Sequence, residues 1–244
     1  MPKFSIIIPV CGQEELTKNC IASIRKHSED PEIILVENGQ CDFHIEADQI
    51  ISNEKNLGFP IAVNQGIRAS HGDIVVILNN DTLVTPHWLN HLAEHLKYAD
   101  IVGPVTNYIS GPQKIPFHRF NTDFSLEKFA NDLYKKNKLE SFPFHRLVFF
   151  CVAIKREVFD KIGFLDEQFS PGNFEDDDFC LRAIQAGFEL VIATDVFIYH
   201  VGSQTHNFLN LDYAKLLETN KAKFFAKWPE STYYDIIKRY REKN

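Results

Sequence analysis

The residues best suited to chemistry stand directly after apolar runs of the sequence. Asp81 follows the run 74–78 through Asn79 and Asn80, and His200 ends a later apolar run. Because ligands of open parallel sheets bind at the carboxyl ends of the strands, these side chains are placed to meet a ligand. A carboxylate and a neutral imidazole can hold Mn²⁺ or Mg²⁺ while phosphate oxygens complete the coordination. A simple turn at Asp81 and a purely structural histidine are the competing interpretations, and they stay open.

A second candidate is the run of four acidic residues from Glu175 to Asp178, at the start of a predicted helix. Acidic residues favour the first helical turn through the macrodipole, so this position alone can explain some of them. Four consecutive carboxylates exceed what capping needs. If this helix start faces the metal site, one carboxylate could act as a general base toward an acceptor hydroxyl.

The elements that must position these residues alternate between strands and helices. Continuous apolar runs predict the strands, and apolar residues at helical spacing predict the helices. The predicted strands cover 4–10, 33–36, 74–78, 100–104, 147–154, 189–193 and 196–199, and the helices cover about 16–24, 60–70, 86–98, 156–162 and 176–186. Thr85 is the expected N-cap of the helix 86–98, with Pro86 in its first position. This order predicts an α/β fold with a mostly parallel central sheet flanked by helices.

Two segments depart from this alternation. Residues 105–146 lose clear periodicity, hold several prolines and aromatic residues, and are expected to form an insertion on the acceptor side. Residues 207–244 are charged and are expected to form a helical tail after a catalytic domain over 1–206. The expected docking residues of the tail are Phe224, Phe225, Trp228, Tyr233 and Tyr234. Packing on the catalytic domain, a homodimer contact and peripheral membrane association are all open for this tail.

The composition limits the classes of partner that the chain is expected to bind. The chain holds 26 basic and 33 acidic residues, and the net charge of −7 argues against nucleic acid as a partner. No stretch approaches the roughly 18 apolar residues of a membrane span, so we expect a cytoplasmic protein. The five widely spaced cysteines fit buried thiols in a reducing compartment rather than disulfides.

Seven segments together resemble glycosyltransferase family 2, the large inverting GT-A family, and especially its rhamnosyltransferase-like bacterial branch. The resemblance runs from about residue 4 to residue 206, with the segments in the order typical of the family. They are Ser5–Pro9, Val36–Gly39, Asn56–Asn64, Leu78–Thr82, Gly163–Phe169, Glu175–Ala183 and Tyr199–His200.

The resemblance implies a nucleotide site at the first strands. Pro9 and Val10 are expected to line the base pocket, while Glu37, beside Asn38, stands where the family usually has an Asp that contacts base or ribose. The residues expected to shape the nucleotide wall are Asn56, Gly58 and Asn64. The longer Glu37 side chain departs from the family pattern and bears on which nucleotide binds.

The resemblance also assigns the reacting groups. Asn79, Asn80 and Asp81 match the metal-binding Asp-x-Asp motif, with Asn79 in place of its first acid, and His200 matches a late histidine near the diphosphate. Asp176 matches the base. The adjacent Asp178 is a reserve candidate for the base, and Glu175 belongs to the same motif.

The implied activity is inverting transfer of a sugar from a UDP- or dTDP-sugar to an acceptor hydroxyl, in the synthesis of a bacterial surface glycan or glycoconjugate. A glycan, a lipid-linked saccharide and a protein all fit as the acceptor, and the inner face of the membrane fits as a location. A non-catalytic sugar-nucleotide-binding or scaffold protein is the main alternative, because Glu37 and Asn79 depart from the motifs. A nucleotidyltransferase fits less well, because the first strand is followed by the acidic segment 12–15 rather than a basic, Gly-rich loop.

Overall fold

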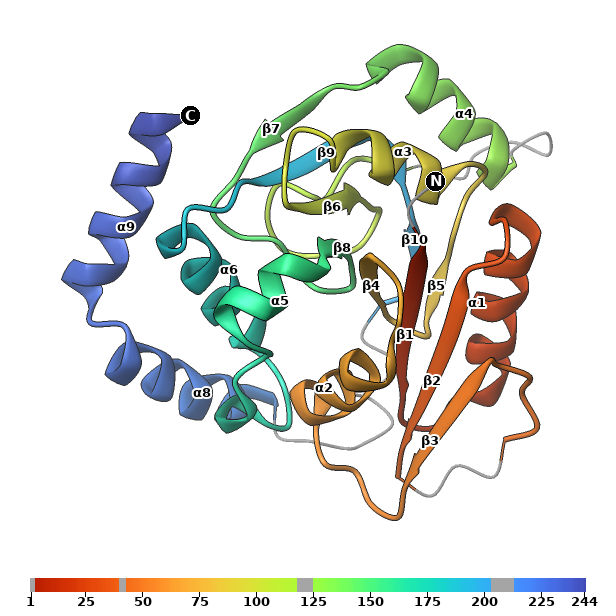
Figure 1. The fold of residues 1–244 in the computed structure, drawn as a ribbon, viewed down its shortest axis with the longest axis horizontal. Coiled ribbons are helices and arrows are strands. Elements are labelled where there is room, and N and C mark those ends of the chain that lie inside the picture. The colour runs from red at the N-terminus through yellow and green to blue at the C-terminus, as the bar shows by residue number, and fades with distance from the viewer. Residues whose placement is uncertain (1–2, 40–42, 118–124, 203–212) are drawn as a thin grey trace.

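A computed structural model describes residues 3–39, 43–117, 125–202 and 213–244 of the chain. Its centre is an eight-stranded sheet with the strand order β3-β2-β1-β4-β8-β6-β9-β7 (Figure 1). The strands are β1 (Phe4–Val10), β2 (Glu32–Asn38), β3 (Gln49–Asn53), β4 (Ile74–Leu78), β5 (Thr82–Leu83), β6 (Ile101–Val105), β7 (Ser141–Pro143), β8 (Cys151–Lys155), β9 (Leu190–Phe197) and β10 (Tyr199–His200). The helices are α1 (Glu14–His27), α2 (Phe59–Ala69), α3 (Trp88–His95), α4 (Leu126–Asn137), α5 (Arg156–Ile162), α6 (Glu175–Gln185), α8 (Tyr213–Lys227) and α9 (Glu230–Lys243), with the 3₁₀ turn η1 (Glu167–Phe169).

The predicted, mostly parallel sheet is confirmed, with two antiparallel exceptions. Strands β3, β2, β1 and β4 run parallel, as does the pair β6 and β9. Strand β8 is antiparallel to both β4 and β6, and β7 is antiparallel to β9. Strand β7 follows helix α4, and only residues 144–150 separate β7 from β8. Neither strand pairs with the strand that precedes it in the chain, so no βαβ unit sets its direction.

Strand β3 was missed because it lies at the edge of the sheet. Its residues are alternately half-buried and exposed, and Ile50 is 47% exposed. It therefore lacks the continuous apolar run that identified the buried strands β1, β2 and β4.

The expected cap of the helix 86–98 is wrong. Helix α3 begins only at Trp88, and its N-cap is His87 in the left-handed conformation. The Thr85 hydroxyl instead donates to the Phe197 carbonyl oxygen at 2.7 Å, across to strand β9. A tertiary hydrogen bond thus replaces the local cap.

The second half of the chain differs from prediction mainly at element boundaries. Strand β8 begins at Cys151 rather than residue 147, and residues 190–197 form one continuous strand, β9. The segment 105–146 contains helix α4 and the edge strand β7. The described cysteines, Cys11, Cys20, Cys151 and Cys180, are free thiols, and all but Cys11 are buried.

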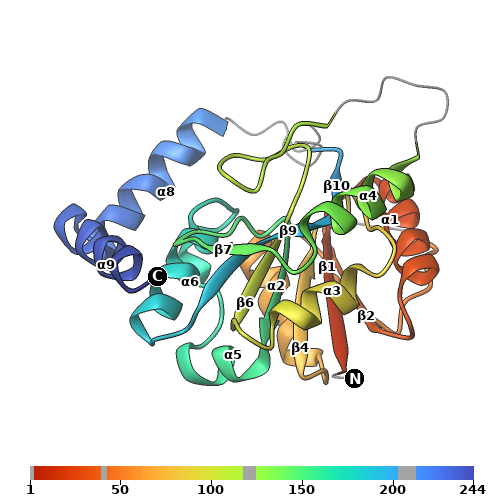
Figure 2. The same cartoon turned by 90° about the horizontal axis from the view of Figure 1, so that it is seen from above.

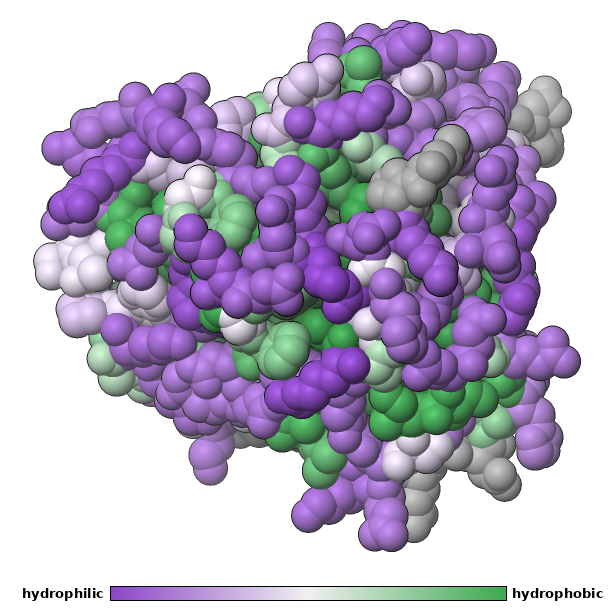
Figure 3. Space-filling model, in the orientation of Figure 1, coloured by the Kyte–Doolittle hydropathy of each residue, from purple (hydrophilic) through white to green (hydrophobic). Residues whose placement is uncertain are grey.

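Two apolar layers cover the sheet. One layer contains Ile8, Ile24 and Leu92, so α1 and α3 pack on that face. The other layer contains Val63 and Phe179, so α2 and α6 cover the opposite face. Hydrophilic side chains cover most of the face in Figure 3, and hydrophobic ones show between the elements.

The tail packs on the rest of the chain through a separate apolar cluster. Helices α8 and α9 lie beside α6 in both ribbon views (Figures 1 and 2), and Phe224 and Trp228 are buried against Phe169 and Leu181. Tyr234, expected to dock, is instead 62% exposed. Within the described ranges, no helix has the length and apolarity needed to cross a membrane.

Candidate active site

Asp81 and His200 are brought together by a two-stranded antiparallel ladder. Strands β5 and β10 pair so that His200 lies opposite Thr82, one residue beyond Asp81. The Val201 amide donates to the Asp81 carbonyl oxygen at 2.9 Å and continues this ladder. Asp81 and His200 are each 5% exposed, and His200 Nε2 lies 3.2 Å from Asp81 Oδ1.

The surroundings of His200 fix which ring nitrogen carries the proton. Its Nδ1 lies 2.8 Å from the Tyr108 carbonyl oxygen, which can only accept, so Nδ1 is the donor. In the neutral imidazole, Nε2 then directs a lone pair toward Asp81 Oδ1. Two electron-rich atoms at this distance need a proton or a cation between them.

A divalent cation fits this pair. Carboxylate oxygen and imidazole nitrogen suit Mn²⁺, and diphosphate oxygens can supply the remaining ligands. Among the described residues, no group of three or more His, Cys, Asp and Glu side chains could hold a metal by itself. The site therefore suits a cation that arrives together with a phosphorylated ligand.

Asn79 and Asn80 support the turn in front of Asp81. The Asn79 amide donates to the Phe150 carbonyl oxygen at 2.8 Å, and its own carbonyl oxygen accepts from the Thr82 hydroxyl at 2.7 Å. The Asn80 side chain is buried and donates to Thr17 Oγ1 at 3.0 Å, on helix α1. Asn80 therefore faces the fold rather than the cation pair.

The predicted nucleotide residues meet at the carboxyl ends of β1, β2 and β3. Val10 pairs with Glu37, and Glu37 pairs with Ser52 in the sheet register. The Ser52 hydroxyl donates to the Glu37 carboxylate at 2.6 Å, which holds this buried side chain on β3. Pro9, one residue earlier on β1, is half-buried at the same edge.

Asn38 and Asn56 organise the loop before α2. Asn38 Nδ2 donates to Asn56 Oδ1 at 2.9 Å, and the same Asn56 oxygen accepts from the Gly58 amide at 2.8 Å. Asn56 Nδ2 contacts the Cys11 sulfur at 3.6 Å, so it links this loop to the end of β1. Asn38 is 4% exposed, which makes it a support for the wall rather than its surface.

Gly58 and Asn64 join this wall to the segment before α6. Gly58 has φ +95°, and a Cβ there would lie 2.9 Å from the Pro171 Cα. Asn64 is buried, and its side chain donates to the Leu165 carbonyl oxygen and accepts from the Leu165 amide. The Asn64 side chain therefore supports the wall from inside the fold and does not form its surface.

The four acids of α6 have different surroundings, and Asp178 is the most constrained. It is fully buried, and its Oδ2 accepts from Arg182 Nε at 2.8 Å. Its Oδ1 accepts from Trp228 Nε1 at 2.8 Å and lies 2.7 Å from Lys227 Nζ. With donors on both oxygens, Asp178 anchors the tail helix α8.

The pKa values of Glu175 and Asp177 are both raised. Burial, followed by the neighbouring charge of Asp176, raises the pKa of Glu175 well above its usual range. The same two causes, in the same order, raise the pKa of Asp177 to about 7. Asp177 Oδ1 lies 3.0 Å from Arg146 Nε, which limits this rise.

Asp176 is 7% exposed, and its Oδ1 accepts from the Asp177 amide at 2.9 Å. Just before α6, the Tyr213 hydroxyl donates to Asn173 Oδ1 at 3.2 Å. Burial, followed by the charges of Asp176 and Tyr108, raises the pKa of Tyr213.

Sequence reasoning missed Arg146, Lys227 and Trp228, which sort the α6 carboxylates, and Tyr108, which orients His200. Arg146 and Tyr108 lie in or next to the aperiodic insertion, where no spacing pattern assigns a partner. The tryptophan was recognised only as an apolar docking residue. No local pattern in the sequence predicts its hydrogen bond to a residue 50 positions earlier.

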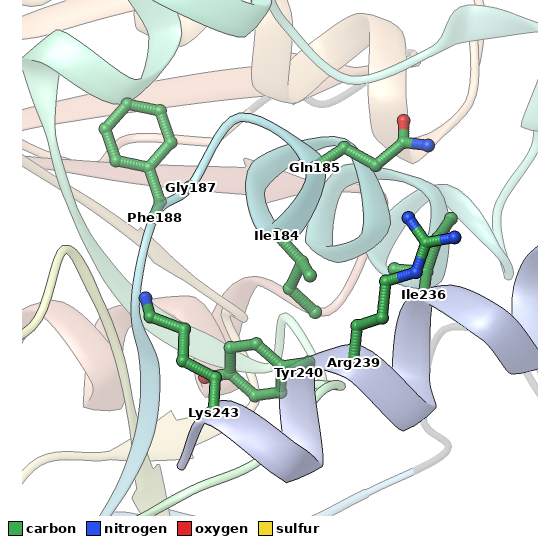
Figure 4. A pocket seen from close by; sticks show the side chains of 8 residues that line it. All are labelled: Ile184, Gln185, Gly187, Phe188, Ile236, Arg239, Tyr240 and Lys243. Atoms are coloured by element: carbon green, nitrogen blue, oxygen red, sulfur yellow. The ribbon is translucent and has the colours of Figure 1, made fainter.

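A cavity of about 460 Å³ lies elsewhere, between the end of α6 and α9 (Figure 4). Ile184, Phe188 and Tyr240 contribute apolar walls, and Arg239 and Lys243 bring positive charge. None of the predicted site residues lines it. The cavity is therefore separate from the candidate active site.

Known proteins share this fold. Glycosyltransferase GlyG of Streptococcus pneumoniae is 24% identical over 211 residues, which cover 80% of this chain and 67% of that protein. A structure of GalNAc-T7 with UDP, GalNAc and Mn²⁺ matches with a TM-score of 0.65 and 19% identity, over 99% of this chain and 55% of that one. The mannosyltransferase PcManGT from Pyrobaculum calidifontis, with GDP-Man and Mn²⁺, matches with a TM-score of 0.64 and 17% identity, over 91% of this chain and 64% of that one.

At these low sequence identities, the structural matches show the fold alone. The chain spans little more than half of the GalNAc-T7 structure. The family model provides the more specific result. The model of glycosyl transferase family 2 matches residues 5–163, which include the nucleotide wall and Asp81. The chain therefore belongs to glycosyl transferase family 2.

Proposed function

We propose that this protein is an inverting glycosyltransferase that moves a sugar from a UDP- or dTDP-sugar to an acceptor hydroxyl. Family membership and the structural neighbours bound to UDP or GDP-Man support a nucleotide-sugar donor. Inversion, the rhamnosyltransferase-like branch and a role in bacterial surface glycans remain predictions from the family resemblance. The division into a domain over 1–206 and a tail, the cytoplasmic location and the choice of base are further predictions from the sequence.

The observation that carries the proposal is the pair of Asp81 and His200. The buried carboxylate oxygen of Asp81 and the imidazole lone pair of His200 are 3.2 Å apart. This geometry favours a divalent cation site over the two alternatives, a simple turn at Asp81 and a purely structural histidine. A cation bound there would offset the negative charge that develops on the leaving diphosphate. The Tyr108 carbonyl oxygen keeps Nε2 available for that cation, because it accepts a hydrogen bond from Nδ1–H.

Among the α6 carboxylates, Asp176 is the best-supported base. Asp178 is committed to donors on both oxygens, and burial raises the pKa of Glu175, which favours its protonated form. Asp177 is paired with Arg146. Asp176 would remove the proton of the acceptor hydroxyl as that oxygen attacks the anomeric carbon from the face opposite the diphosphate, so one displacement inverts the anomeric centre.

Thermal stability with UDP, dTDP and GDP, each with and without Mn²⁺, tests this proposal. We expect one nucleotide to raise the melting temperature only when Mn²⁺ is present, because ligand binding to the folded state stabilises it. Asp81→Ala should abolish that rise. Asp132→Ala, at an exposed acid of α4, is the matched control and should retain it. Absence of any nucleotide effect in the wild type would favour a scaffold protein.

A further inference from the structure

A small cavity is lined by Arg146 and by Asp177, the residue that follows the proposed base Asp176. Its volume is about 170 Å³, and it is formed by the loop 110–113, the segment 144–148, Asp177 of α6 and Tyr233 of α9. Asp177 lines this cavity, and its amide is bonded to the proposed base Asp176. The cavity wall therefore includes the sequence neighbour of the proposed base.

The walls combine aromatic rings with polar side chains. Phe144 and Tyr233 both line the cavity, and rings of this kind can cover the apolar face of a sugar. Tyr233 is held in place by edge contacts to Phe224 and Phe225, at centroid distances of 5.8 and 6.1 Å. The tail therefore presents a fixed ring to the cavity.

His145 supplies the second observation. Its Nδ1 is buried and has no hydrogen-bond partner in the part of the chain that the structure describes. Burial, followed by the charges of Arg241 and Arg146, lowers the pKa of His145 to about 4, so the ring is neutral at neutral pH. A buried polar atom left unpaired is costly. The His145 ring lines the cavity, and a rotation of this ring would turn Nδ1 toward a ligand hydroxyl.

Charge also limits the ligand. Arg146 is the cation that lines the cavity, and Asp177, at 3.0 Å, offsets much of its charge. A neutral imidazole, a paired guanidinium and two aromatic rings suit a hydroxyl-rich, uncharged ligand better than a phosphate.

We propose that this cavity is a subsite for a neutral saccharide unit of the acceptor, held against Tyr233 and hydrogen-bonded to His145. The inference rests on the proposed glycosyl transfer and makes the acceptor a saccharide. The C-terminal tail then contributes directly to acceptor binding, through Tyr233.

Saturation-transfer NMR with a panel of methyl hexopyranosides at millimolar concentration tests this subsite on the full chain, without the donor. We expect saturation transfer to at least one glycoside in the wild type. The signal should fall by about tenfold in Tyr233→Leu, which keeps apolar packing but removes the ring. It should also fall in His145→Leu, a second variant that leaves the tail packing intact. Tyr234→Leu, at the exposed neighbouring position, is the matched control and should keep the signal.

Nucleotide binding is measured on the same samples by the thermal shift with UDP and Mn²⁺. Absence of any glycoside signal in the wild type, or equal signals in folded Tyr233→Leu and His145→Leu, would overturn the subsite. Absence of a nucleotide shift would count against the proposed function alone, because glycoside binding is detected without a donor.

Discussion

Asp81 and His200 are joined by backbone pairing between β5 and β10, whereas the carboxylates of α6 are distinguished by side chains from other parts of the chain. At the strand ends, the register of this two-stranded ladder brings Asp81 and His200 together. At α6, four identical or similar side chains in a row receive different environments from Arg146, Lys227 and Trp228. Neighbouring positions in a sequence can therefore differ in chemistry because of contacts that only tertiary structure provides.

The sharpest way to break this comparison is Asp176→Asn. We expect turnover of the donor to fall by about 10²–10⁴-fold, the usual contribution of a general base, while the stabilisation by UDP and Mn²⁺ is retained. Turnover is followed as release of the nucleotide. Asp132→Asn should behave as the wild type. Near-normal turnover in Asp176→Asn would remove this residue from the role of base.

Trp228→Phe tests the control of α6 by the tail. This change removes the hydrogen bond to the buried Asp178 carboxylate, so the free energy of unfolding should fall by about 1.5–3 kcal/mol. Urea unfolding followed by circular dichroism measures the loss. Tyr234→Phe, at an exposed position, should leave stability unchanged. Equal stability of the two variants would show that the tail does not support α6.

Gly58→Ala tests the donor side. The Gly58 backbone has φ +95°, and a Cβ added there would lie 2.9 Å from Pro171 Cα. The Gly111 backbone has φ +88°, and a Cβ added there would meet nothing within 4 Å. We expect Gly58→Ala to lower the free energy of unfolding by about 1–3 kcal/mol more than Gly111→Ala, because only the first change overpacks the fold. Similar losses in the two variants would indicate that backbone strain, not the contact with Pro171, decides.

The dependence of stability on pH sharpens the assignment of Asp177. Its folded pKa of about 7 exceeds the ordinary value of 3.8, so the folded state holds more protons between these values. Stability should therefore fall as pH rises through this window. Asp177→Asn should remove up to about 1.4 kcal/mol per pH unit of that slope, and Asp132→Asn should not. An unchanged slope in Asp177→Asn would contradict the raised pKa.

Much of the donor side could be predicted from sequence because its information is local. Buried parallel strands have continuous apolar runs, so β1, β2 and β4 were identified, and the polar residues after them were placed at one edge. The edge strand β3 lacks such a run and was missed. The antiparallel direction of β8 was not predicted, because β8 pairs with β4 and β6, and neither of these strands directly precedes it in the chain.

The acidic helix shows where prediction from sequence ends. Its position and its C-terminal Gly187 follow from helical spacing and capping, and the structure confirms both. The difference between Asp176 and Asp178 does not follow from the sequence pattern, because the donors that occupy Asp178 include Lys227 and Trp228 of the tail. Tyr108, which fixes the tautomer of His200, is equally invisible to spacing, because its backbone carbonyl makes the contact.

We propose that Asp81 and His200 together hold one cation, which also binds the nucleotide diphosphate. Calorimetric titration of UDP, with and without Mn²⁺, into the wild type, Asp81→Asn, His200→Gln and the double variant tests it most directly. If the two residues act as one site, each single change should weaken Mn²⁺-dependent binding by at least about tenfold, and the double change should add less than about threefold more. Fully multiplicative losses, or wild-type affinity for UDP that does not depend on Mn²⁺, would contradict the shared cation site.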